Sequence, residues 1–131
     1  MKRTMLLHAE LSEVIARLGH GDLLVIGDAG LPIPDGPRRI DLAVSANVPR
    51  FQDVLAAVLA EMQVESAVIA DELAPNNPAV HDALLRQLGI TPVATLSHEL
   101  FKKATREARA IVRTGEFSPY ANVILRAGVV F

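Results

Sequence analysis

The chain has 131 residues, of which 50% are apolar and only 4% aromatic, with no Trp, no Cys and a formal net charge of −2. A chain of this length buries roughly two thirds of its unfolded surface, so we expect a single domain over residues 1–131 with an aliphatic core. The interspersed charges exclude the basic stripe that nucleic acids require, and the lack of Cys excludes disulfides, thiolate catalysis and cysteine zinc sites.

The first predicted elements are a helix and a buried strand. Apolar residues recur at i, i+3, i+4 and i+7 over Leu11–Leu18, which is typical of an amphipathic helix. Gly19 stands where a left-handed C-terminal cap is expected, which places His20 directly after the helix end. Leu23–Ile26 is a continuous apolar run, as in a strand covered on both faces, and Asp28 lies just beyond its far end.

The middle of the chain alternates between turns, strands and helices. Residues 29–39 contain five Gly and Pro residues, so this segment is predicted to be a loop at the carboxyl edge of the preceding strand. The patterns that follow predict a strand over Ile40–Val44, a helix over Phe51–Met62, a strand over Val64–Ala70, a helix over Ala79–Leu88 ended by Gly89, and a strand over Pro92–Leu96.

The last third adds a short helix and two strands. Ser97 is a suitable N-cap for a helix through Lys103, which puts His98 in its first turn. Ala108–Val112 and Val123–Phe131 are predicted as closing strands with no helix between them. The whole pattern indicates an α/β fold, a three-layer domain with a mostly parallel mixed sheet whose antiparallel part involves the closing strands.

Polar residues at strand ends and in loops are the candidates for function, because open α/β sheets bind ligands there. Each candidate alone also has an ordinary structural explanation. His20 could interact favourably with the helix dipole, and Asp28 could be a turn former. His98 could be an exposed residue of a first helical turn, Tyr120 could be a turn residue packed on the surface, and Asn122 could hydrogen-bond the neighbouring backbone.

Metal and nucleotide sites are not expected. No two of the four histidines have the i, i+4 spacing of a helical zinc motif. The segment Gly27–Gly30 follows a strand, but Pro32 and Pro34 remove the backbone donors that would cradle a phosphate.

A membrane or export signal is not expected either. The longest apolar runs have about four residues, whereas a transmembrane helix needs about 20. The segment Met1–Leu7 begins like a signal peptide, but Glu10 and Glu13 arrive before an apolar region forms. We therefore expect a soluble cytoplasmic protein.

Taken together, the local motifs resemble one family over essentially the whole chain. The sequence resembles the D-ribose pyranase family, which shares its fold and ancestry with the L-fucose mutarotases, and the loops 29–34 and 118–122 look like the ribose branch. The matching stretches are Ser12–Asp22, Gly27–Pro34, Arg39–Leu42, Glu61–Glu65, Ser97–Glu99 and Gly115–Asn122.

The resemblance implies an isomerase that interconverts the pyranose and furanose forms of ribose and needs no cofactor. It also implies a ring-based homo-oligomer, reported as a decamer. By match to the family, His20 is the proton donor, and the sugar-binding residues are Asp28, His98, Tyr120, Ala121 and Asn122.

Ring exchange needs one group that protonates the ring oxygen and another that accepts the anomeric hydroxyl proton. Histidine suits such transfers near neutral pH. A position after a helix end favours the charged form of His20, and a helix start favours neutral His98. Whether Asp28 or His98 is the base stays open. Ribose is uncharged, so a site without a cationic clamp is chemically suitable.

If residues 22–27 form a straight strand, His20 and Asp28 stand roughly 20 Å apart at about 3.3 Å per residue. We therefore expect a composite site, with His20 from one subunit and Asp28 with His98 from its neighbour. Two alternatives remain at this stage. One is an L-fucose-type mutarotase, and the other is a non-catalytic sugar-binding partner of a transport system.

Overall fold

A six-stranded sheet forms the centre of the computed structural model, which describes residues 1–131. The strands lie in the order β2-β5-β1-β6-β3-β4. Strand β6 is antiparallel to its neighbours β1 and β3, and all other pairs are parallel, which confirms the mostly parallel mixed sheet. The bounds are Leu23–Gly27 (β1), Arg38–Asp41 (β2), Val64–Ala70 (β3), Val93–Leu96 (β4), Ala110–Arg113 (β5) and Val123–Ala127 (β6).

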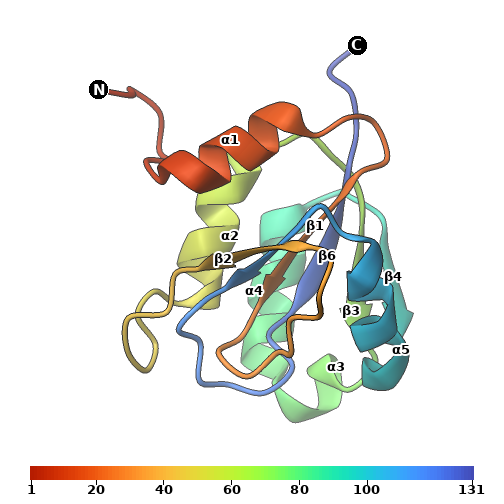
Figure 1. Cartoon of the computed structure of the whole chain (residues 1–131). Helices are drawn as coiled ribbons and strands as arrows, with labels where there is room; N and C mark the ends of the chain where they lie inside the picture. The colour runs from red at the N-terminus through yellow and green to blue at the C-terminus, as the bar shows by residue number, and fades with distance from the viewer.

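Helices cover both faces of this sheet and complete three layers, with α2 and α4 behind the sheet and α5 in front of it in Figure 1. No helix is both long and apolar enough to cross a membrane. The helices are Ala9–Arg17 (α1), Phe51–Leu59 (α2), Leu73–Asn76 (α3), Pro78–Leu88 (α4) and His98–Ala104 (α5), and a 3-10 turn over Thr105–Glu107 follows the last one.

The core is divided by the sheet into a large and a small part. A cluster of 23 buried residues joins α1, α2 and α4 to one face and includes Leu24 and Ile26 of β1. A cluster of 6 buried residues joins α5 to the other face and includes Val25 of the same strand. Because successive strand residues point to opposite faces, burial on both sides explains the unbroken apolar run in β1.

The predicted cap at Gly19 is wrong. Helix α1 ends at Arg17 with Leu18 as its extended C-cap, and the residue with positive φ is Gly21, at +87°. The left-handed residue is therefore Gly21 and not Gly19. The Gly21 N–H donates to the Ala127 carbonyl at 2.8 Å, which holds the turn against β6 at this position. Since helix-dipole effects fade within one turn, the sequence argument for a charged His20 loses its basis.

Other elements also differ from the sequence predictions. The strand predicted over Ala108–Val112 is Ala110–Arg113, and the helix predicted over Phe51–Met62 ends at Leu59. The second strand is Arg38–Asp41 and not Ile40–Val44, because it aligns with β5 from the pair Arg38–Ala110 onward. The final strand ends at Ala127 and does not reach Phe131. Helix α3 was not predicted, because its four residues are too few to show a helical period.

Candidate functional site

Five of the six predicted site residues meet at the carboxyl edge of the parallel strands. Asp28 follows β1, and His98 opens α5 directly after β4. Strand β6 runs the opposite way, so the residues that precede it, Tyr120 to Asn122, reach the same edge. The Asn122 Oδ1 accepts the Asp28 backbone N–H at 2.8 Å, and the rings of His98 and Tyr120 meet edge to face at 5.0 Å.

The turn that carries Tyr120 is held in an unusual conformation. Tyr120 has φ of +58°, which non-glycine residues adopt rarely and at a cost in free energy. The Asn77 side chain donates to the Pro119 carbonyl and to the Ser118 hydroxyl, each at 2.9 Å. These two bonds stabilise the turn and keep the Tyr120 ring against His98.

Two polar atoms at this edge are buried without a hydrogen-bond partner, namely His98 Nδ1 and Asn122 Nδ2. Asn122 is fully buried, at 0% exposure. Buried polar atoms are almost always paired in folded proteins, because an unpaired one keeps the full cost of losing water. These atoms therefore lie where a ligand with hydroxyl groups could complete their hydrogen bonds.

His98 is anchored through its backbone as well as its ring. Both carboxylate oxygens of Glu72 accept the His98 backbone N–H at 3.0 Å, which caps the start of α5 with a negative charge. The His98 ring also stacks on Phe101, with a centroid distance of 6.3 Å and an interplanar angle of 14°. Backbone and ring are thus both held, which fixes the direction of the unpaired Nδ1.

Burial raises the pKa of Asp28 above its usual value, although the Gly30 N–H, which donates to Oδ1 at 2.9 Å, opposes this effect. A raised pKa makes the carboxylate a better proton acceptor than an exposed aspartate. Beside it lies a hollow of about 310 Å³ lined by Asp28, Ala29, Gly30 and the segment 116–119. Its wall is rigid, since the buried Glu116 accepts the Phe51 N–H and the Ser118 hydroxyl.

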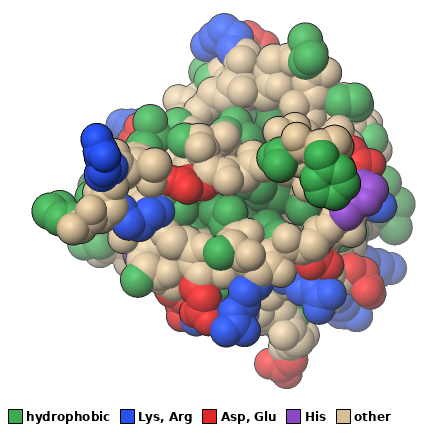
Figure 2. Space-filling view, turned by 90° about the horizontal axis from the view of Figure 1, so that it is seen from above, with side chains coloured by type: hydrophobic (Ala, Val, Ile, Leu, Met, Phe, Trp, Pro, Cys, Tyr) green, Lys and Arg blue, Asp and Glu red, His purple; other side chains and the backbone are tan.

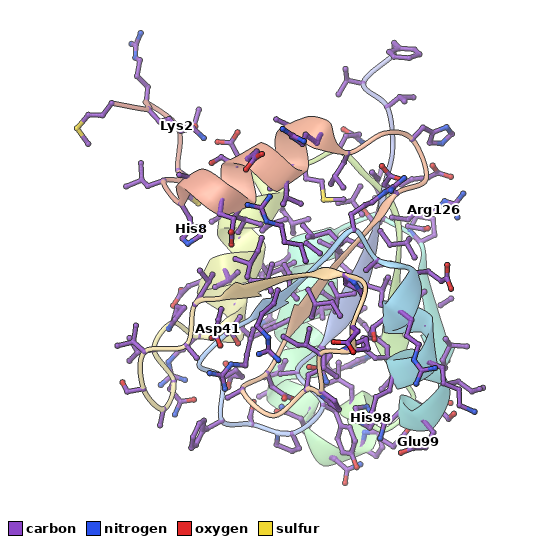
Figure 3. All side chains as sticks on the ribbon, viewed as in Figure 1. Lys2, His8, Asp41, His98, Glu99 and Arg126 are labelled. Carbon is purple, nitrogen blue, oxygen red and sulfur yellow. The ribbon has the colours of Figure 1, made fainter.

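His20 lies at the opposite end of the sheet, in the turn between α1 and β1. Its Nε2 is 2.6 Å from Glu65 Oε2 on β3. In Figure 3, Arg126, whose guanidinium lies beside Gly21, is near the end of the sheet below α1, and His98 is near the opposite end. The five residues of β1 between the two ends span about 16 Å. One chain therefore does not bring His20 to the other five predicted residues.

Sequence reasoning missed several residues that support the site. Glu72, which caps His98, had no local signal, because its role appears only when α3 folds next to α5. Asn77 lies just before the predicted helix Ala79–Leu88 and has no local signal for its contact with the Tyr120 turn. Glu116 lies inside the matching stretch Gly115–Asn122, so the sequence could have indicated this acidic side chain as part of the site.

The site as a whole suits a small, uncharged molecule rich in hydroxyl groups. The five residues at the carboxyl edge supply amide, imidazole, phenol and carboxylate groups and no cation. No group of three or more His, Cys, Asp or Glu side chains is placed to hold a metal ion. The fold and this edge define an α/β protein with a polar edge that suits a small molecule with hydroxyl groups.

Comparisons with known proteins give the family. The model of the RbsD / FucU transport protein family matches residues 1–130. The D-ribose pyranase of Symbiobacterium thermophilum is 61% identical over 131 residues, and that of Paracidovorax citrulli is 64% identical over 133 residues, with 100% of both chains covered in each case. The chain belongs to the RbsD / FucU transport protein family.

Solved structures agree with this assignment. The structure of Bacillus subtilis RbsD complexed with D-ribose matches with a TM-score of 0.96 and 45% identity, covering 100% of both chains. A fucose mutarotase in complex with L-fucose from Streptococcus pneumoniae matches with a TM-score of 0.82 and 26% identity, covering 95% of this chain and 94% of that one. The fold is therefore shared across the family, and the ribose-bound structure is much more similar in sequence.

Proposed function

We propose that this chain is a D-ribose pyranase, an isomerase that interconverts the pyranose and furanose forms of ribose, with residues 1–131 as one catalytic domain. The observation that supports this most strongly is the full-length identity of 61% and 64% to relatives named D-ribose pyranase. L-fucose mutarotation is the second candidate, but the fucose-bound neighbour is only 26% identical.

The reaction requires one acid and one base that exchange roles. His20 donates a proton to the ring oxygen O5 while the C1–O5 bond breaks, and the base takes the proton of the anomeric hydroxyl, which leaves the open-chain aldehyde. The C4 hydroxyl then attacks C1 and gives its proton to His20, while the base returns its proton to O1. Both residues are regenerated and no redox step occurs.

The residues at the carboxyl edge take the remaining roles. Asp28 is the base, supported by the burial that raises its pKa. His98 Nδ1 and Asn122 Nδ2, which lack partners within the chain, bind sugar hydroxyls. Tyr120 lines the sugar, which the packing of its ring on His98 supports. The Ala121 side chain is fully buried in the large core cluster, so this residue contributes through its backbone.

The proposal includes a composite site, in which His20 of one subunit serves the sugar held by its neighbour. The separation of His20 from Asp28 along β1 supports this arrangement. Exposed apolar side chains occur at both ends of the sheet. Phe131, the last residue, is 101% exposed at the end that carries the termini, and Phe117 is 70% exposed beside Asp28 at the other end. Figure 2 shows apolar side chains around a hollow at the end that carries the termini.

Contact between two unlike ends of a subunit closes into a ring when the rotation allows it. The ring-based homo-oligomer, a decamer by family resemblance, therefore forms part of the proposal, and sedimentation of the purified chain tests it. The cytoplasmic location expected from the sequence is also included, and fractionation of cells that express the chain from its own gene tests that point.

Saturation-transfer NMR on equilibrating sugars tests the function. The chain is expected to accelerate magnetisation transfer between ribopyranose and ribofuranose, with little effect on the exchange of L-fucose anomers. Faster exchange with fucose alone would establish the mutarotase instead. No acceleration with either sugar, combined with measurable ribose binding, would indicate a non-catalytic sugar-binding protein.

A further inference from the structure

The turn that carries His20 is attached firmly to the sheet. The Gly21 N–H donates to the Ala127 carbonyl and the Ala127 N–H donates to the Asp22 carbonyl, both at 2.8 Å. Asp22 also accepts the Gly19 N–H at 2.9 Å and the Arg109 Nε–H at 3.0 Å. The backbone of His20 is thus fixed next to the carboxyl end of β6, and only the imidazole ring is left to be oriented.

Glu65 approaches this ring from an irregular position in β3. The pairing of β3 with β6 shifts between Val64, opposite Ala127, and Ser66, opposite Arg126, so Glu65 is the extra residue of a β-bulge. Bulges re-aim side chains and are frequent next to active sites. Here the bulge coincides with the side chain that meets the His20 Nε2 at 2.6 Å.

The contact specifies which imidazole nitrogen carries which proton. An ionised carboxylate only accepts hydrogen bonds, so the His20 Nε2 must be the donor to Glu65. The other nitrogen, Nδ1, has no hydrogen bond within the chain. It is therefore the nitrogen that can exchange a proton with the sugar. A partner on one nitrogen that fixes the tautomer and ring direction is a recurrent feature of catalytic histidines.

We propose that Glu65 is a positioning residue that holds the Nε2–H of His20 so that Nδ1 faces the sugar and exchanges the proton. This inference rests on the proposed role of His20 as the proton donor. In each half of the reaction, the proton moves between Nδ1 and a sugar oxygen, while the Nε2–H stays on the ring and remains bonded to Glu65. The Arg126 Nε lies 3.9 Å from the other carboxylate oxygen of Glu65, Oε1.

The test compares Glu65→Ala and Glu65→Gln by ribose exchange NMR on the full chain. Glu65→Ala is expected to lower the exchange rate about tenfold or more, a part of the 10²–10⁴ that general acid–base catalysis supplies, with ribose affinity unchanged. Glu65→Gln keeps an acceptor oxygen and should retain more activity than Glu65→Ala. Glu13→Gln is the matched control, because its side chain has the same 44% exposure and also forms ion pairs with arginine, and it should have no effect.

Two further readouts separate positioning from a general structural role. In ¹⁵N NMR of the imidazole, the wild-type chain should show His20 as the Nε2–H tautomer, and Glu65→Ala should give a mixture. In a chain that already has His20→Ala, the Glu65→Ala change should lower ribose exchange no further. The inference would be overturned if Glu65→Ala left the His20 tautomer unchanged. It would also be overturned if Glu65→Ala lowered ribose exchange in the His20→Ala chain by the same factor as in the wild-type chain. If His20→Ala itself left ribose exchange intact, the proposed function would be at fault and not the Glu65 contact.

Discussion

Mixing two inactive variants should restore activity if the site is shared between subunits. His20→Ala removes the acid and Asp28→Ala removes the base, so neither chain is active alone. Strand β1 lies between these two residues and alone spans about 16 Å, so each composite site takes His20 and Asp28 from different chains. In a random ring of equal parts, about a quarter of the subunit contacts join an intact His20 to an intact Asp28. The mixture should recover about that fraction.

The assay is ribose exchange NMR after the two variants are unfolded together and refolded. Each variant refolded alone, and a mixture of two batches of the His20→Ala chain, serve as controls and should remain inactive. Recovery near a quarter of the wild-type rate supports the composite site. No recovery from a mixture that sediments like the wild-type oligomer would mean that His20 and Asp28 serve the same sugar within one chain, and the composite site would be wrong.

Three further predictions concern the carboxyl edge. Burial raises the pKa of Asp28, so the folded chain disfavours ionisation of this carboxyl. Ionisation therefore lowers the free energy of unfolding above the raised pKa. The effect is absent below the ordinary value of 3.8, where the carboxyl is protonated in both the folded and the unfolded chain. Asp28→Asn should therefore raise the melting temperature at pH 7 and lose this gain near pH 4; an equal gain at both pH values would contradict the account. Gly115→Ala should destabilise the chain by about 3 kcal/mol in urea unfolding, because the added Cβ would overlap the Val48 carbonyl oxygen, and an unchanged midpoint would show that the loop adjusts freely. Phe101→Ala removes a fully buried ring under His98 and should lower stability by about 3–5 kcal/mol and raise the KM for ribose; a KM equal to that of the wild type would mean that His98 needs no support from this ring.

The parts of the fold that could be predicted are those with a strong local pattern. The strand Val64–Ala70 matches its prediction at both ends, and the helix through Leu88 is capped by Gly89 at φ +58°. The errors occur where tertiary contacts decide the geometry. Gly19 was given the role of Gly21, because the hydrogen bond from Gly21 to β6 cannot be read from residues that are adjacent in sequence.

The site residues also divide into those that local patterns predict and those whose placement depends on tertiary contacts. The placement of Asp28 after a buried strand and of His98 at a helix start followed from local patterns, and the structure brings both to one edge. Glu65 lies in the stretch Glu61–Glu65 that matches the family, but the match alone does not predict its contact with His20. That contact depends on a β-bulge formed by pairing between β3 and β6, about 60 residues further along the chain. The period-two pattern of β3 alone contains no sign of it.

The effect of His20→Ala on ribose exchange shows whether His20 is the proton donor. At equal protein concentration and with an unchanged oligomer, the variant should reduce the pyranose–furanose exchange rate by about 10²-fold or more while still binding ribose through the carboxyl edge. Exchange by the His20→Ala chain at the wild-type rate would contradict the account, because the proton donor would then have to be another group.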